Sequence, residues 1–248
     1  MTGYFDAHNH LQFYASEAEL AAALAGAARA GVAGMICCAT RPGDWAAVAA
    51  ICASRPEVRP AFGVHPWYAG EAAGDWLAGL EALLRGPACV GEIGLDGVRE
   101  APGQEEVFAA QLELARRLGR PAIIHCVRMW GRLVEMLKAG APASFMLHAY
   151  SGPAELVPEL AAMGAYFSFG GEVSDPRRAK LRAALAAVPG DRLLMETESP
   201  EPGGPSWRRG PAGIVETAAA VAAARGIKAE AAAALCAANA GAFLTTIS

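Results

Sequence analysis

The stretch RLLMETESP, residues 192–200, joins three apolar residues to two glutamates that are two positions apart. Leu193 to Met195 read as a buried strand. Alternate side chains of a strand point to the same face, so Glu196 and Glu198 are expected on one side of the chain. Two neighbouring buried carboxylates are unfavourable unless a bound cation, arginines or water compensate them. The stretch therefore predicts a strand that ends in a polar site.

This strand is the last of about eight short β-like runs, which alternate with Ala-, Leu- and Glu-rich segments of helical spacing. We expect a single-domain (β/α)8 TIM barrel over residues 1–248, because such barrels typically have about 250 residues. A doubly wound open sheet is the second choice. The Pro- and Gly-rich segment Glu201 to Pro211 is expected to be a loop after the last strand. The eight runs begin at Tyr4, Val32, Arg59, Ala88, Pro121, Ala143, Ala165 and Asp191.

The composition of the chain argues against a membrane protein and against tight non-specific binding to nucleic acid. The hydrophobic content is 54%, but much of it is alanine, and the start MTGYFDAHNH does not resemble an export signal, so we expect none. We therefore expect a cytoplasmic protein with no membrane partner and no evident obligate protein partner. The net charge of −4 gives no overall basic field for tight non-specific binding to nucleic acid. The six cysteines, which form no CxxC pair, are expected to be reduced core residues.

The histidines are the most informative residues. Carboxyl ends of parallel strands converge on one face of a barrel, where active sites of this fold are built. So many ligand-capable side chains on one face predict a metal site, and their number favours two divalent ions, since one closed site needs only about four ligands. The ions could be Mg, Mn, Zn or Co. The side chains at or near run ends are His8, His10, His65, Glu92, Asp96, His125, His148 and Glu198.

The two glutamates of the opening stretch are not equivalent. Glu198 is nearer the strand end and is therefore the better ligand. Glu196 lies one step deeper and could instead be an acceptor that orients a histidine. A surface glutamate pair at a frayed strand is the alternative to both assignments.

Six motifs together resemble the TatD family of metal-dependent deoxyribonucleases. They are DAHNHL at 6–11, GVHPWYA at 63–69, VGEIGLD at 90–96, QEEVFAAQLELARRLGRPAIIHC at 104–126, HAYSG at 148–152 and RLLMETESP from 192. The resemblance implies a (β/α)8 barrel that binds two divalent ions and hydrolyses phosphodiester bonds of DNA, as a 3′–5′ exonuclease. It also implies the metal ligands: His8 and His10 for one ion, His125 and His148 for the other, Glu92 as the bridge and Glu198 as the last ligand.

The chain departs from the family pattern at two places. The position of Glu198 usually holds aspartate, and an Asn-Glu-Pro motif expected near residues 210–217 is missing. Many relatives in the wider superfamily bridge their ions with a carboxylated lysine. Here Lys138, Lys180 and Lys228 all lie in helix-like segments, which favours Glu92 as the bridging group.

Substrate contacts are expected around this site. Glu92 and Glu198 are the predicted catalytic carboxylates, with Glu198 placed to hold or deprotonate the attacking water. His65 and Arg128 are the predicted substrate-binding residues. Further candidates for binding phosphate or stacking a base are Arg208, Arg209, Trp67, Tyr68 and Trp130.

Two other functions fit the same residues. The site could hydrolyse a small ester, an amide or an aminoacyl-tRNA, because activated water attacks carbonyl carbon as well as phosphorus. The barrel could also be a non-catalytic, metal-stabilised binding protein. Turnover of an oligonucleotide separates both from the nuclease.

Overall fold

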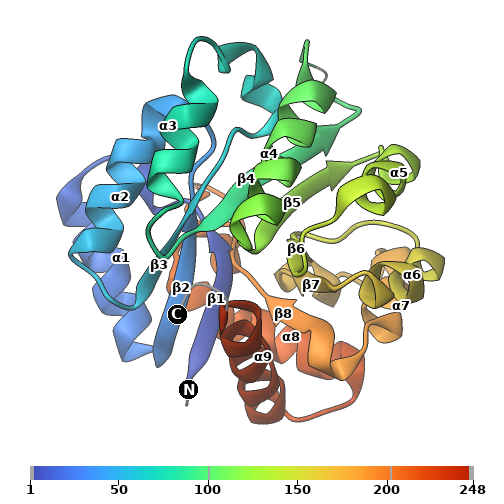
Figure 1. The fold of residues 1–248 in the computed structure, drawn as a ribbon. Helices are drawn as coiled ribbons and strands as arrows, with labels where there is room; N and C mark the ends of the chain where they lie inside the picture. Colours follow the sequence, from blue (N-terminus) through green and yellow to red (C-terminus); the bar gives the residue numbers. More distant parts are fainter. Residues whose placement is uncertain (1–2, 100, 202, 246–248) are drawn as a thin grey trace.

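A computed structural model describes residues 3–99, 101–201 and 203–245, and its eight parallel strands form one sheet in chain order (Figure 1). This arrangement confirms the predicted barrel and excludes the open doubly wound sheet. Each predicted run coincides with one strand, and β3 begins one residue before its run. The strands are β1 Tyr4–Asn9, β2 Val32–Cys38, β3 Val58–Phe62, β4 Cys89–Asp96, β5 Ala122–Val127, β6 Phe145–Leu147, β7 Ala165–Phe169 and β8 Leu193–Met195.

Helices surround the strands and cover the outer face of the sheet (Figure 1). Ser16 caps the first helix by accepting a hydrogen bond from the Glu19 amide, and Gly119 ends the fourth in the left-handed region at φ +63°. No helix in the described part of the chain is long and apolar enough to cross a membrane. The helices are α1 Glu17–Arg29, α2 Trp45–Ala53, α3 Trp76–Leu83, α4 Gln104–Leu118, α5 Trp130–Gly140, α6 Val157–Ala162, α7 Ala179–Ala187, α8 Ile214–Arg225 and α9 Ala229–Phe243.

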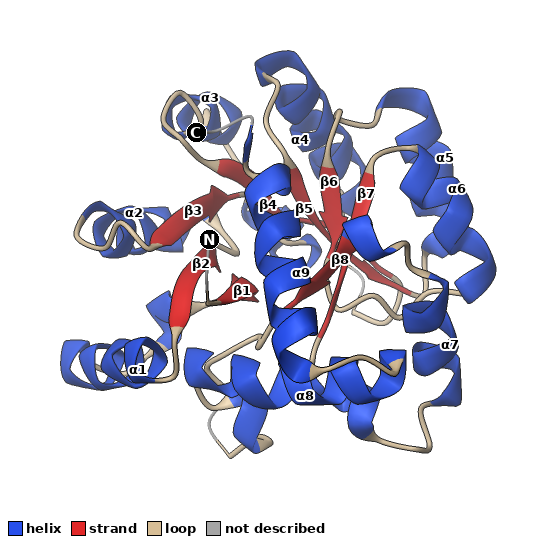
Figure 2. Ribbon diagram, turned by 90° about the horizontal axis from the view of Figure 1, so that it is seen from below, coloured by secondary structure: helices blue, strands red, loops and turns tan. Residues whose placement is uncertain are grey.

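The amino end of the barrel is closed by α9, which crosses in front of the strands when the molecule is seen from below (Figure 2). Its residues Ala237, Ala240 and Phe243 pack into the barrel interior against side chains from all eight strands. These interior side chains are mostly apolar, and Cys38 and Cys89 are among them. All six cysteines are free thiols and five are buried, as predicted.

The seam between β8 and β1 is irregular. The Glu198 amide donates to the His8 carbonyl at 3.0 Å, and the His10 amide donates to the Ser199 carbonyl at 2.8 Å. Below them the buried carboxylate of Asp6 accepts from the Thr197 amide at 2.9 Å and from its hydroxyl at 2.7 Å. Burial raises the pKa of Asp6 to about 7 despite these hydrogen bonds. Separate hydrogen bonds at this seam therefore hold the chain after β8 beside the end of β1.

Several strands are shorter than the sequence predicts. β6 and β8 have three residues each, so His148 and Glu198 lie in irregular chain beyond them, and His65 lies beyond β3. The longer strands β4 and β5 are in register with Gly94 opposite His125. Gly94 has φ +142°, and a Cβ there would overlap the His125 carbonyl oxygen. This glycine therefore permits the close approach of the two strands.

Candidate metal centre

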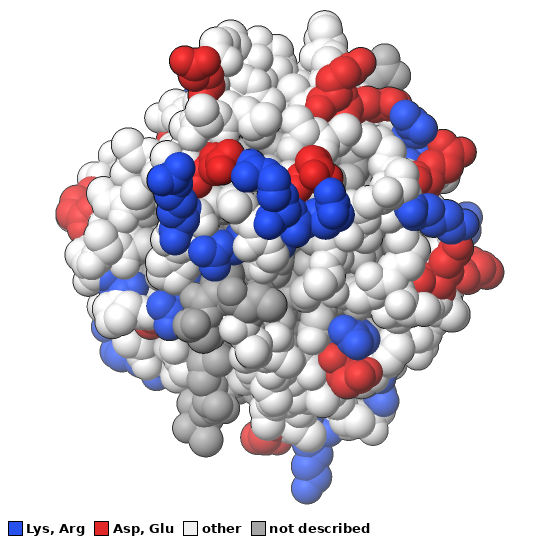
Figure 3. Space-filling model, viewed as in Figure 1, with Lys and Arg blue, Asp and Glu red and all other residues white. Residues whose placement is uncertain are grey.

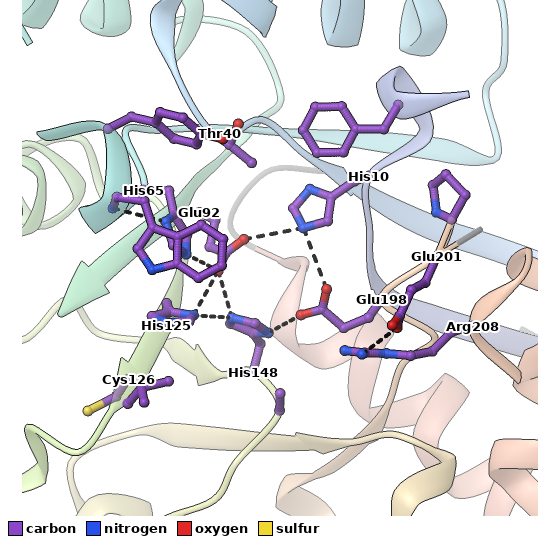
Figure 4. A pocket seen from close by; sticks show the side chains of 16 residues that line it. His10, Thr40, His65, Glu92, His125, Cys126, His148, Glu198, Glu201 and Arg208 are labelled. Carbon is purple, nitrogen blue, oxygen red and sulfur yellow. Dashed lines mark hydrogen bonds and ion pairs between the residues drawn. The ribbon is translucent and has the colours of Figure 1, made fainter. Parts of the chain in front are cut away.

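The predicted histidines and carboxylates meet in a pocket of about 400 Å³ at the carboxyl end of the barrel (Figure 4). Some of them lie within strands and others in the chain just after a strand, at the carboxyl ends that the barrel topology brings together. His8 is fully buried beneath the pocket floor, and the ring of His148 stacks on it at 4.0 Å between centroids. The side chains that line the pocket from the predicted set are His10, His65, Trp67, Tyr68, Glu92, His125, His148, Glu198 and Arg208.

Glu92 is the centre of the cluster. One of its oxygens, Oε1, lies 2.7 Å from His148 Nε2, 3.2 Å from His125 Nδ1 and 3.2 Å from His65 Nε2. Burial alone would raise the pKa of Glu92, but the nearby histidines, His148 foremost, lower it well below its usual value. Glu92 is therefore a buried, ionised carboxylate.

The other oxygen, Glu92 Oε2, faces the seam of the barrel. It lies 3.3 Å from His8 Nε2 and 3.4 Å from His10 Nε2, and these two nitrogens are 3.1 Å apart. Glu198 completes this half, 3.7 Å from His8 and 3.6 Å from His10. The Nδ1 of His10 donates to the Cys38 carbonyl at 2.8 Å, so in the neutral ring Nε2 presents a lone pair to the cluster.

His125 and His148 form the other half. Nε2 of His125 bonds to Asp96 Oδ2 at 3.2 Å, which directs Nδ1 toward Glu92 and His148. Burial alone would raise the pKa of Asp96, but hydrogen bonds, those from the Arg99 amide and the Trp67 indole foremost, lower it to about 2. Asp96 is thus an ionised carboxylate that orients His125.

His65 is held in one tautomer. Its Nδ1 accepts a hydrogen bond from the Trp67 amide at 3.2 Å, so the neutral ring carries its proton on Nε2, which faces Glu92 at 3.2 Å. Burial lowers the pKa of His65. This geometry makes His65 a donor to Glu92 rather than a free nitrogen ligand.

Glu196 lies close to the cluster and has a different set of partners. Its Oε1 accepts from the Ala149 amide at 2.7 Å and its Oε2 accepts from the Ser168 hydroxyl at 2.5 Å. The distance from Oε1 to His148 Nδ1 is 4.0 Å, too long for a hydrogen bond. Burial raises the pKa of Glu196 to about 8. Glu196 therefore fixes the turn that carries His148 and does not orient the imidazole directly.

Two glutamines of α4 support the site, and the sequence analysis did not identify them. Gln111 forms two hydrogen bonds with the backbone of Val64, next to His65, at 2.7 and 3.1 Å. Gln104 pairs in the same way with the backbone of Asp96, at 2.8 and 3.2 Å. Both occupy positions of the buried face of α4, and such polar residues in an apolar stripe were the available signal.

The donor set fits divalent cations. Burial and the neighbouring His148 lower the pKa of His8 to about 4, so this imidazole is neutral and can act as a ligand. Nδ1 of His148 is buried and faces Glu198 Oε1 at 3.1 Å. Among the described residues, histidines and carboxylates form four groups in which the possible ligand atoms lie within 4.8 Å of one another. These groups are His8, His10 and Glu198; His8, Glu92 and His148; His65, Glu92 and His125; and His148, Glu196 and Glu198.

Not all predicted substrate-binding residues reach this pocket. Arg208 lines it and pairs with Glu201 at 2.5 Å. Arg128 and Trp130 line a neighbouring pocket, and Trp130 is the first residue of α5. Arg209 lines neither pocket. The sequence analysis also missed Phe13, which lines the rim with 47% of its surface exposed.

Comparisons with known proteins identify the family of this chain. Residues 5–245 match the model of the TatD related DNase family. The 3′-5′ ssDNA/RNA exonuclease TatD of Edwardsiella piscicida is 36% identical over 71% of this chain and 72% of its own length. The uncharacterized metal-dependent hydrolase YjjV of Escherichia coli is 32% identical over 80% of each chain, and its crystal structure superposes with a TM-score of 0.87 over 97% of each chain. The chain therefore belongs to the TatD family of metal-dependent hydrolases.

Proposed function

We propose that this hydrolase is a deoxyribonuclease that removes nucleotides from the 3′ end of single-stranded DNA by cleaving phosphodiester bonds. The observation that carries the proposal is the placement of Glu92, an ionised carboxylate surrounded by imidazoles at the floor of an open pocket. The printed name of the Edwardsiella relative supports the choice of substrate.

The two oxygens of Glu92 face opposite halves of the cluster, which supports a site for two divalent ions with Glu92 between them. His8, His10 and Glu198 would hold one ion, and His125 and His148, whose nearest ring nitrogens are 3.2 Å apart, would hold the other. Bound there, the ions would neutralise charge on the phosphate and lower the pKa of a water molecule, so that hydroxide is available near neutral pH.

The residues of the chain have separate tasks in this scheme. Glu198 accepts a proton from the attacking water, since its carboxylate is ionised and lines the pocket. Burial would raise its pKa, but His8 and His148 lower it. His65 holds Glu92 through Nε2 and contacts the bound phosphodiester. Trp67, 39% exposed at the rim, is a surface on which the terminal base stacks.

The test is product length. Purified protein with Mg²⁺ or Mn²⁺ is incubated with a 5′-labelled single-stranded oligonucleotide, alongside an EDTA control. We expect a ladder that shortens from the 3′ end, absent with EDTA and with Glu92→Gln and present with Glu57→Gln, which neutralises an exposed glutamate. A folded, metal-loaded wild-type protein that leaves the oligonucleotide intact would contradict the proposal and move the function to an ester or amide substrate.

A further inference from the structure

A second pocket, of about 640 Å³, borders the metal centre on the side of β5 and β6. Val127 lines both pockets, so they are adjoining parts of one surface at the carboxyl end of the barrel. We call this second pocket the strand pocket. Four of its lining residues bear on ligand binding: Arg128, Trp130, Gly152 and Lys180.

Two cationic side chains that line the strand pocket have no partner among the described residues. Arg128 and Lys180 are exposed, and neither makes a hydrogen bond or an ion pair with another residue in the described ranges. Other arginines are paired, such as Arg117 with Glu81 at 2.6 Å, and many Lys and Arg side chains in Figure 3 lie beside Asp or Glu. Among the described lining residues Glu155 carries the one negative charge, so the strand pocket is net positive.

An aromatic ring is fixed at the edge of the same pocket. Trp130 packs edge-on against the fully buried ring of Tyr150, with centroids 4.8 Å apart, and the Tyr150 hydroxyl donates to the Pro153 carbonyl at 2.8 Å. A Cβ on Gly152 would lie 2.7 Å from the Tyr150 hydroxyl and 2.9 Å from the Trp130 ring. The glycine thus makes room for this packing, which leaves a half-buried, preorganised indole for stacking.

The spacing matches a polymer that enters the metal centre. Arg128 follows His125 by three residues, and Ser151 follows His148 by three. Three residues of chain span at most about 10 Å, which corresponds to about three stacked nucleotide steps of about 3.4 Å. Phosphates one to three steps from the scissile bond therefore fall within reach of the strand pocket.

From these observations we infer that the strand pocket binds the nucleotides on the 5′ side of the scissile bond, with Arg128 and Lys180 at the phosphates and Trp130 against a base. The inference rests on the proposed function and specifies its substrate class: a single-stranded polynucleotide of several residues, rather than a dinucleotide or a small phosphodiester. The catalytic pocket alone accounts for cleavage, and the strand pocket adds affinity for the chain.

The test compares Arg128→Gln/Lys180→Gln with a matched control, Arg59→Gln/Lys228→Gln, which removes an exposed arginine and an exposed lysine elsewhere. Substrates are bis(4-nitrophenyl) phosphate, a dinucleotide and an octanucleotide. We expect kcat/KM for the octanucleotide to fall about tenfold or more in the first variant, and its salt slope to decrease by about 1.4, about 0.7 for each lost phosphate contact. Hydrolysis of bis(4-nitrophenyl) phosphate should stay within about twofold, because it does not reach the strand pocket.

Uncharged methylphosphonate linkages locate the contact. One such linkage, placed one to three steps on the 5′ side of the scissile bond, should weaken wild-type cleavage and leave the double variant unaffected. Equal salt slopes and equal length dependence in wild type and double variant would overturn the inference.

A binding measurement distinguishes failure of the strand-pocket inference from failure of the proposed function. If wild type hydrolyses small phosphodiesters but no oligonucleotide, the nuclease proposal fails. Fluorescence anisotropy of a labelled octanucleotide with EDTA-treated protein still tests the strand pocket. A smaller salt slope in the double variant than in wild type supports it, and equal slopes or no binding by wild type overturn it.

Discussion

The two ends of the barrel use the same strands for different purposes. At the amino end, Ala237, Ala240 and Phe243 of α9 fill the interior with apolar side chains. At the carboxyl end, a few residues further along the chain, imidazoles and carboxylates meet around Glu92. The amino end is therefore filled by apolar packing, whereas the carboxyl end gathers ligand atoms that could hold cations.

Because the two ends differ in this way, substitutions at one end should affect stability and substitutions at the other end should affect activity. A change at the α9 end removes packing that every strand shares, and a change at the Glu92 end removes a charge that the packing does not need.

Glu92→Gln should lower kcat/KM by about 10³-fold or more and leave the far-UV circular dichroism unchanged. The amide keeps the shape of the side chain but cannot supply two anionic oxygens to the two halves of the cluster. Steady-state kinetics and bound-metal analysis check both points. Activity within a few-fold of wild type, with full metal content, would contradict the role of Glu92.

Phe243→Ala should lower the free energy of unfolding by about 3–5 kcal/mol, because it empties the interior under α9. Below the melting temperature, kcat/KM should remain within about twofold of wild type. Urea denaturation measures the first effect. Ile227→Ala, which truncates a side chain that is 41% exposed, is the control and should change the free energy of unfolding by about 0.5 kcal/mol or less. A large loss of activity in folded Phe243→Ala would show that the two ends are coupled.

Glu198→Asp, which introduces the residue usual in the family, should reduce kcat/KM by about 10–100-fold. The hydrogen bond from the Glu198 amide to the His8 carbonyl fixes the backbone at φ +57°, so the shorter side chain withdraws from His10 and His148. Kinetics at saturating metal test this. Activity at or above the wild-type level would mean that the backbone moves to compensate.

Gln111→Leu should lower the free energy of unfolding by about 1–3 kcal/mol and reduce kcat/KM by less than about tenfold. It leaves the buried amide and carbonyl of Val64 without partners and loosens His65. Gln12→Leu, which removes a glutamine bonded to the Cys38 carbonyl beside His10, is a useful comparison. Unchanged stability in Gln111→Leu would contradict the support that we assign to α4.

The barrel and the cluster were predictable because their signals are local. Apolar runs mark the strands, and His8, His125 and Glu92 lie within strands whose carboxyl ends must converge. The lengths of β6 and β8 were not predictable. They depend on bonds between segments far apart in the chain, such as Glu196 to the Ala149 amide and Glu198 to the His8 carbonyl.

The direction of a side chain after the end of a strand was also not predictable from the sequence. Arg128 has φ +56°, so the chain turns away and its side chain lines the strand pocket instead of the metal centre. The role of α9 was hidden too, because its Ala-rich sequence resembles α8, which covers the outside of the barrel. Both features follow from tertiary packing, which overrides local propensity.

The most direct test of the central claim is the anomalous diffraction of crystals grown with Mn²⁺. The account predicts two peaks about 3.5–4 Å apart on either side of the Glu92 carboxylate, one near His8 and His10 and the other near His125 and His148. Crystals of Glu92→Gln should show weaker peaks or none. Saturated wild-type crystals with no anomalous peak among these residues would contradict the metal centre.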